Sequence, residues 1–189
     1  MANLESKVVL VPLAQSCEEL EAVTIIDLLV RADVTVITAS LDGNKVITGS
    51  RGVQLIAQTT LDMVLNDAFD MVILPGGLPG SDYLNQDDRI ISLLQRMAES
   101  KKPVAAICAA PKVLVTAGLL DGKLATSFPG VIDQNPALGM TYLEDAVVED
   151  SLVITSRSVG SAMDFALTLI ERLCGLEVRQ TVEKSLLRS

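Results

Sequence analysis

Short apolar runs alternate along this chain with longer stretches that mix apolar and polar residues, and turn residues separate the two kinds. The runs are typical of strands buried on both faces of a sheet, and they cover residues 7–13, 35–39, 71–74 and 103–107, with weaker strands at 123–125, 146–148 and 152–155. The mixed stretches predict helices from a cap at Ser16 to about Ala32, and over 83–99, 112–117 and 159–174. This alternation, without a long linker, predicts a single α/β domain over residues 1–189 around a mainly parallel sheet.

Local signals add detail to this outline. Ser16-Cys17-Glu18-Glu19 matches a capping box, with serine at the N-cap and glutamate three residues later. Residues 46–48 and 53–56 predict a small hairpin across Gly49-Ser50-Arg51-Gly52. The tail, 181–189, predicts a short helix that frays into disorder.

The charge balance narrows the classes of partner. The net charge is −9 and the chain has no run of Lys or Arg, which argues against nucleic acid and anionic membranes. Residues 1–6 lack a charged segment followed by an apolar one, and no apolar run approaches the ~18 residues that span a bilayer. We therefore expect a soluble, cytoplasmic protein.

The numbers of cysteines and histidines limit the metal sites and catalytic mechanisms that are possible. Cys17, Cys108 and Cys174 are odd in number and widely spaced, which fits neither a disulfide framework nor a zinc or other metal site. The chain has no histidine, so catalytic arrangements that need one are excluded. A nucleophile here must be activated by a carboxylate, by backbone amides or by a helix dipole.

The segment 103–111, with sequence PVAAICAAP, combines an apolar run, a lone cysteine and a proline suited to the first turn of a helix. Strand, sharp turn, thiol and helix in this order are typical of a nucleophile elbow, and the small Ala106 and Ala110 permit a tight turn. The helix N-terminus would favour a thiolate at Cys108. The segment fits equally well a cysteine that is only a small buried side chain.

In a parallel sheet, ligands bind at the carboxyl ends of the strands. Three segments qualify: 14–17, Pro75-Gly76-Gly77, whose backbone can approach a ligand closely, and Cys108. Glu21 has Ile25 and Leu28 as neighbours at helical spacing, and burial between them would raise the pKa of its carboxyl. That helix is apolar almost all round, so the pattern does not distinguish Glu21 from Glu18 or Glu19.

Three motifs together resemble the ThiJ/PfpI superfamily, most closely its parkinsonism-associated deglycase (DJ-one) branch with its bacterial relatives. They are CEELE at 17–21, LPGG at 74–77 and AAICAAP at 105–111, and the resemblance extends from about Lys7 to Gln180. It implies a flavodoxin-like sandwich of helices around the sheet, a homodimer, small aldehyde substrates and no cofactor.

The resemblance also assigns residues. It implies that Cys108 is the elbow cysteine and that Glu21 is its paired, protonated carboxyl. The amides of Gly77 and Ala109 would bind the oxyanion, and Gly76 would line the pocket. Arg51 would reach the partner subunit, and Arg31 would lie near the dimer contact. Two positions depart from the family: Phe128 stands where many members carry histidine, which removes a proton carrier, and Ala110 replaces a common glycine.

Two functions follow as alternatives. In the first, Cys108 attacks glyoxal, methylglyoxal or an early adduct on an amino group, and the product is a 2-hydroxy acid. In the second, Cys108 is oxidised to sulfinate in a redox sensor or holdase chaperone without turnover. A cysteine peptidase or amidotransferase is disfavoured because those relatives use a histidine. We expect Cys108 to be the one low-pKa cysteine, Cys17 and Cys174 to serve packing, and Arg157 to be an ion-pair partner.

Overall fold

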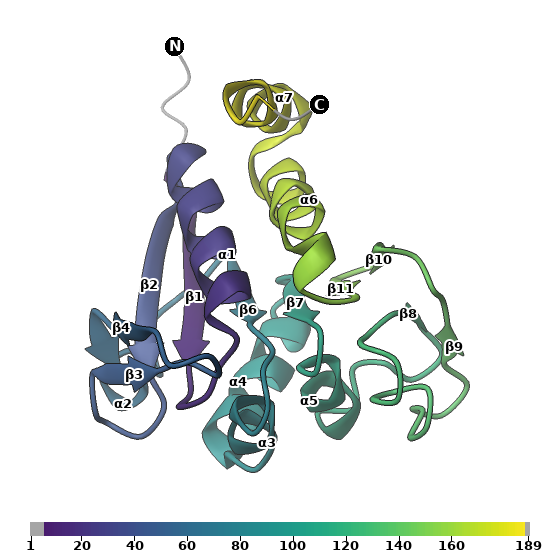
Figure 1. Ribbon diagram of the computed structural model, residues 1–189. Helices are drawn as coiled ribbons and strands as arrows, with labels where there is room; N and C mark the ends of the chain where they lie inside the picture. Colours follow the sequence, from purple (N-terminus) through teal and green to yellow (C-terminus); the bar gives the residue numbers. More distant parts are fainter. Residues whose placement is uncertain (1–5, 188–189) are drawn as a thin grey trace.

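The computed structural model describes residues 6–187 and shows a central sheet with helices on both faces (Figure 1). Over these residues the sheet has seven strands in the order β10-β11-β7-β6-β1-β2-β5. Their bounds are β1 Val8–Leu13, β2 Thr35–Ser40, β5 Thr59–Thr60, β6 Met71–Leu74, β7 Val104–Ile107, β10 Val147–Asp150 and β11 Val153–Ser156. Every neighbouring pair is parallel except β10 and β11.

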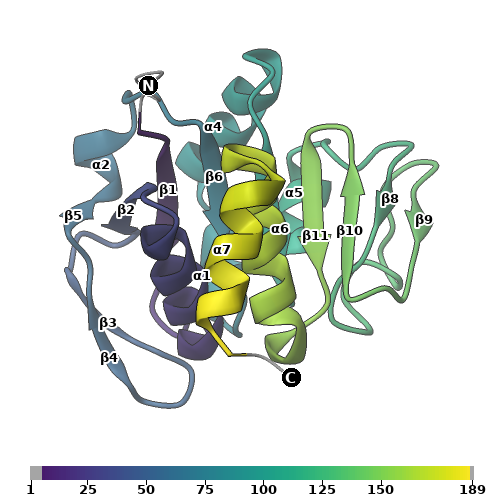
Figure 2. The same ribbon diagram turned by 90° about the horizontal axis from the view of Figure 1, so that it is seen from above.

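Two hydrophobic clusters lie on the two faces of the sheet, because successive strand residues point to opposite sides. The first contains Val9, Val11 and Leu13 of β1, together with side chains of α1 (Glu19–Arg31), α6 (Ala162–Cys174) and α7 (Leu176–Ser185). The second contains Leu10 of β1 and side chains of α2 (Leu61–Val64), α3 (Gly80–Asn85), α4 (Asp88–Glu99) and α5 (Pro111–Thr116). In Figure 2, α7 lies in front of α6 and beside α1. The predicted flavodoxin-like α/β sandwich is thus confirmed.

Smaller elements lie outside the main sheet. An antiparallel hairpin pairs β3 (Val46–Thr48) with β4 (Gln54–Ile56), as predicted. A short parallel pair joins β8 (Leu124–Ala125) and β9 (Thr141–Tyr142). A turn of 3₁₀ helix, η1 (Val159–Ser161), precedes α6.

Three predicted boundaries are wrong. The helix expected over 83–99 is two helices, and Asp87 begins the second by accepting a hydrogen bond from the Arg89 amide at 2.9 Å. The helix expected from 181 begins at Leu176 as α7, and its Val182 is buried, so this segment is packed rather than frayed. The expected disorder at 188–189 lies outside the described residues. The capping box is absent: Glu18 is the N-cap of α1 and no side chain caps it.

The topology places a switch point beside β1. From β1 the chain continues to β2 on one side, and it later enters β6 on the other side. A crevice at the carboxyl ends of the strands is expected where the direction of winding reverses. Segments after β1, β6 and β7 meet there, at the lower edge of the sheet in Figure 1. No helix within residues 6–187 has the length and apolar character to cross a membrane.

Candidate active site

Cys108 occupies a sharp turn between β7 and α5. Its φ is 62°, in the left-handed region that costs a non-glycine residue about 1–3 kcal/mol. Two hydrogen bonds hold this conformation: the Cys108 amide donates to the Ser156 carbonyl at 2.9 Å, and the Phe128 amide donates to the Cys108 carbonyl at 2.9 Å. Ala110 already has helical dihedrals, so no glycine is needed there. The strand, turn and helix of the predicted elbow are confirmed.

Glu21 lies fully buried in α1 and faces the segment after β6. Its Oε2 accepts a hydrogen bond from the Gly76 amide at 2.8 Å. Burial raises the pKa of Glu21 to about 7, against the lowering effects of the Gly76 amide and the Cys108 thiol. The thiol is close enough to change this pKa, yet Oε1 has no partner in hydrogen-bonding geometry within the described residues. Glu21 is therefore a buried carboxyl that titrates near neutral pH, with one oxygen available.

The sequence predicts a low-pKa thiol at Cys108 beside a protonated Glu21, whereas beside an ionised Glu21 the pKa of the thiol is shifted upward. Burial raises the pKa of Cys108 to about 12, and the charge of an ionised Glu21 and the hydrogen bond that this carboxylate accepts from the thiol add to this effect. Hydrogen bonds from the Gly77 and Ala109 amides lower the pKa without reversing the shift. These amides belong to the loop after β6 and to the turn before α5 rather than to a helix, and burial outweighs them.

Two glycines permit the close contact between these segments. A β-carbon at Gly76 would lie 2.7 Å from both Cys108 Cβ and Glu21 Oε2. Gly77 has a φ of 94°, and a β-carbon there would lie 2.3 Å from the Glu18 amide nitrogen. Real β-carbons do not approach other atoms so closely, so both positions require glycine. The site thus brings together Cys108, Glu21, Gly76, Gly77 and Ala109.

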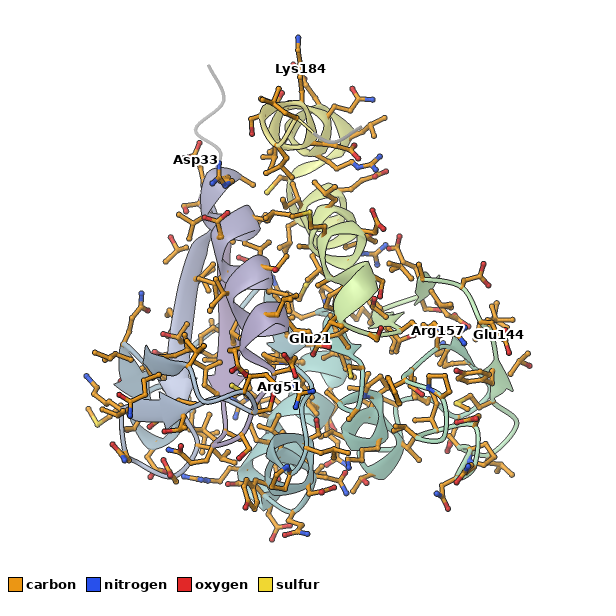
Figure 3. The ribbon with its side chains drawn as sticks, viewed as in Figure 1. Glu21, Asp33, Arg51, Glu144, Arg157 and Lys184 are labelled. Carbon is orange, nitrogen blue, oxygen red and sulfur yellow. The ribbon has the colours of Figure 1, made fainter. Side chains whose placement is uncertain are left out.

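Arg51 lies in the turn between β3 and β4, and its backbone amide donates to Glu19 Oε1 at 2.8 Å. Its side chain is exposed, and Figure 3 shows it in the region of Glu21. Phe128 lies beside the elbow through its bond to the Cys108 carbonyl, and half of its side chain is exposed. Arg31 is separate: it pairs with Asp27 at 2.6 Å, at the opposite end of α1 from Glu21.

The remaining sequence candidates have different surroundings. Cys17 is buried in the core, and burial raises its pKa to about 12, which fits a packing role. Cys174 was expected in the core but is only partly buried, and it lines a surface cavity of about 510 Å³ that Arg31 also lines. The predicted ion pair of Arg157 is confirmed, with Glu144 at 3.9 Å (Figure 3).

Sequence reasoning missed the structural role of Glu19. Its carboxylate is buried and accepts hydrogen bonds from the Arg51 amide at 2.8 Å, the Val53 amide at 3.3 Å and the Ser50 hydroxyl at 3.2 Å. The neighbouring Glu18 accepts from the same hydroxyl at 2.7 Å. The acidic pair was visible in the sequence, but its partners lie more than thirty positions away.

Among the described residues, no three His, Cys, Asp or Glu side chains come together as a metal site. The titratable group that acts on the sulfur is the carboxyl of Glu21, and the backbone amides of Gly77 and Ala109 act on it as well. A thiol, a carboxyl and amides in this arrangement are the groups that nucleophilic catalysis requires.

Comparison with known proteins places this chain among relatives with the same fold. It is 42% identical over 185 residues to protein dj-1beta of Drosophila melanogaster, covering 96% of this chain and 97% of that one. It is 33% identical over 186 residues to the Caenorhabditis elegans protein named glutathione-independent glyoxalase DJR-1.2, covering 98% of each. The crystal structure of Drosophila DJ-1beta superposes with a TM-score of 0.93 at 40% identity, covering 98% of this chain and all of that one.

The match to the Arabidopsis thaliana protein DJ-1 homolog B is 38% identical over 180 residues and covers 95% of this chain. This chain spans only 41% of that longer relative. The DJ-1/PfpI family profile matches residues 7–172, which is most of the sequence. On this evidence the chain belongs to the DJ-1/PfpI family.

Proposed function

We propose that this protein converts glyoxal and methylglyoxal to 2-hydroxy acids by a cofactor-independent reaction at Cys108. One observation carries the proposal: a buried carboxyl with a pKa of about 7, Glu21, lies beside the only cysteine held in an elbow turn. A general base is most effective when its pKa is near the working pH. The naming of one relative as a glutathione-independent glyoxalase supports the same chemistry.

The first step follows from the two pKa values. With a thiol pKa of about 12 and a carboxyl pKa of about 7, the resting pair is a neutral thiol beside a partly ionised carboxylate. As the sulfur attacks the aldehyde carbon, its proton moves to Glu21 and a carbon–sulfur bond forms. The Gly77 and Ala109 amides, which already act on the sulfur, then stabilise the negative charge that develops on the adjacent oxygen.

The second step rearranges the hemithioacetal. Glu21 first returns the thiol proton to the alkoxide, which gives a neutral hemithioacetal and restores the carboxylate. Glu21 then removes the proton from the former aldehyde carbon while the hydroxyl proton moves to the neighbouring carbonyl oxygen. It returns its proton to that neighbouring carbon, which gives a thioester of a 2-hydroxy acid. One carbon is oxidised and the other is reduced, so no external redox partner is required. Water then hydrolyses the thioester, which releases the hydroxy acid and restores the thiol. Phe128 provides no proton carrier, so Glu21 alone serves both transfers. The early adducts that aldehydes form on amino groups are a further candidate substrate.

A second function uses the same geometry. Glu21 carries a proton about half of the time near pH 7, and its Oε1 has no partner among the described residues. A protonated carboxyl so placed would donate a hydrogen bond to an oxygen atom on an oxidised Cys108. In this alternative, the protein senses oxidants or acts as a holdase chaperone, and it shows no turnover.

Lactate formation from methylglyoxal decides between the two functions. Purified protein is incubated with methylglyoxal, and D- and L-lactate are measured beside a Cys108→Ala control. We expect turnover that is lost in the variant, and a kcat/KM that rises with pH through about 7 as Glu21 ionises. Absence of turnover, with holdase activity that persists in the variant, would contradict the enzymatic proposal.

We further propose that two copies of this chain form a homodimer through α1 and β4. Apolar side chains are exposed there, with 47% of Val23, 55% of Val30 and 77% of Ile56 accessible to solvent. They border a shallow cavity of about 430 Å³ between the helix and the hairpin. A contiguous exposed apolar surface of this kind usually marks a protein interface, and Arg51 lies in the turn of the same hairpin.

A further inference from the structure

The turn between β3 and β4 is ordered by contacts to α1 rather than by the main sheet. All five backbone amides from Gly49 to Val53 have partners, and only two of these partners are within the turn: Gly49 donates to Val53 at 2.8 Å, and Gly52 donates to Gly49 at 3.0 Å. The Ser50 amide donates to the Cys17 carbonyl at 2.8 Å. The Arg51 and Val53 amides both donate to Glu19.

The Glu19 carboxylate packs directly against this turn. Only 7% of Glu19 is exposed, and a β-carbon at Gly49 would lie 2.5 Å from Glu19 Oε2, so the turn packs directly on the carboxylate. Burial acts to raise the pKa of Glu19, but its own amide and those of Val53 and Arg51 outweigh that effect and lower it. Glu19 is therefore ionised at neutral pH, and hydrogen bonds to a charged acceptor are about twice as strong as neutral ones.

The turn is connected to the active site through few bonds. Cys17, which holds the Ser50 amide, is followed by Glu18, whose amide donates to the Gly76 carbonyl at 2.8 Å. The Arg51 guanidinium is exposed and has no ion pair within residues 6–187. It is a cation held close to the start of α1, where three carboxyl groups lie, at Glu18, Glu19 and Glu21 (Figure 3).

We propose that Glu19 is a positioning residue: its carboxylate fixes the Gly49–Val53 turn and so holds Arg51 at the rim of the Cys108–Glu21 site. The role of Arg51 at that rim rests on the proposed function, whereas the order of the turn does not. Glu19 touches no reacting atom in this scheme. It acts through Arg51, so its loss weakens substrate binding more than the chemical step.

Limited trypsin digestion reports on the turn, because trypsin cleaves after Arg51. All variants are digested at one protein concentration, because the same hairpin lies in the proposed dimer interface. Glu19→Ala leaves the Arg51 and Val53 amides without their acceptor, and we expect cleavage at Arg51 in the native protein to be about tenfold faster. Glu19→Gln keeps an acceptor without its charge and should give an intermediate rate. Gly49→Ala, which displaces the Glu19 carboxylate, should accelerate cleavage in the same way.

Glu18→Ala is the matched control, since it removes one charge from the same helix start but only the bond from the Ser50 hydroxyl. Its cleavage rate and KM should stay within about twofold of the wild type. For Glu19→Ala, we expect KM for methylglyoxal to rise about fivefold while kcat changes less than about twofold. Thermal unfolding identifies variants that do not fold, and Glu19→Gln remains as the milder substitution.

The outcomes separate the two proposals. Equal cleavage of Glu19→Ala and Glu18→Ala would overturn the positioning role, whatever the activity. Faster cleavage with an unchanged KM would overturn the link from the turn to the site. A wild-type protein without turnover would overturn the proposed function, and the digestion would still decide whether Glu19 orders the turn.

Discussion

The strained backbone at Cys108 has a measurable effect on stability. Its φ of 62° is costly for any side chain, while glycine adopts it freely. Glycine normally destabilises a folded protein relative to alanine by roughly 0.5–1 kcal/mol, because it loses more chain entropy on folding. At this position we expect the reverse order: Cys108→Gly should be about 1 kcal/mol more stable than Cys108→Ala in urea unfolding. If Cys108→Gly were less stable than Cys108→Ala, the backbone at this position would not be strained.

Glu21 makes stability depend on pH. Its pKa is about 7 in the folded protein and near 4.5 when unfolded. Between these values the folded state holds a proton that the unfolded state has lost, so the contribution of Glu21 to stability decreases as pH rises from 4.5 to 7. The penalty above pH 7 is about 3 kcal/mol. A glutamine at position 21 resembles the neutral carboxyl and carries no charge at any pH, so the variant does not incur this penalty.

We therefore expect Glu21→Gln to match the wild type in unfolding free energy at pH 4.5 and to exceed it at pH 8. Urea titrations at both pH values measure the difference. The variant should also lose its turnover by a factor of about 10²–10⁴, because a neutral amide cannot accept the thiol proton. An equal stability difference at both pH values would show that Glu21 does not titrate in this range.

At the scale of elements, a substitution in α7 shows whether the C-terminal segment contributes to the folded core. Val182 is 3% exposed and packs in the cluster of α1 and α6, so Val182→Ala should cost about 1–3 kcal/mol of unfolding free energy. Lys184→Ala, at an exposed position of the same helix, is the matched control and should stay within about 0.5 kcal/mol. Similar values for the two variants would indicate that α7 packs only weakly.

The sheet and the elbow could be predicted from the sequence because their signals are local. Apolar runs defined β1, β6 and β7, and Pro111 after Cys108 indicated the start of α5. The capping box at Ser16 was wrong because the partners of Glu19 lie in the turn after β3, which no local pattern reveals. The second helix start at Asp87 did have a local signal, an acidic N-cap residue, that the apolar periodicity obscured.

The chemistry of the site was only partly predictable. The amides that act on the sulfur belong to Gly77 and Ala109, which the resemblance names, and not to the helix that begins at Pro111. The upward shift of the thiol pKa was not predictable because burial depends on which segments pack around the sulfur. These segments come from four other places in the chain: α1, the loop after β6, Phe128 and Ser156. The resemblance singled out Glu21, which the structure places beside Cys108, whereas helical spacing alone did not separate it from Glu18 and Glu19.

At the scale of the whole molecule, the apolar surface of α1 and β4 predicts self-association. Ile56 is 77% exposed in the single chain and belongs to no described core cluster. Ile56→Lys should therefore leave the fold intact and shift a dimer toward monomer by at least about tenfold in dissociation constant, since a buried lysine lacks a partner. Light scattering at micromolar concentration measures this shift. A wild-type monomer under those conditions would contradict the dimer proposal.

The position of β11 has a consequence for synthesis on the ribosome. Strand β7 pairs with β6 on one side and with β11 on the other, and β11 is made much later. Until Ser156 emerges, the apolar Val104–Ile107 segment is an unpaired sheet edge, and the acceptor for the Cys108 amide does not yet exist. Such an edge is prone to pair with other chains. A nascent chain stalled between these strands would therefore expose this edge to other chains, and its elbow turn would lack the Ser156 acceptor until β11 is made.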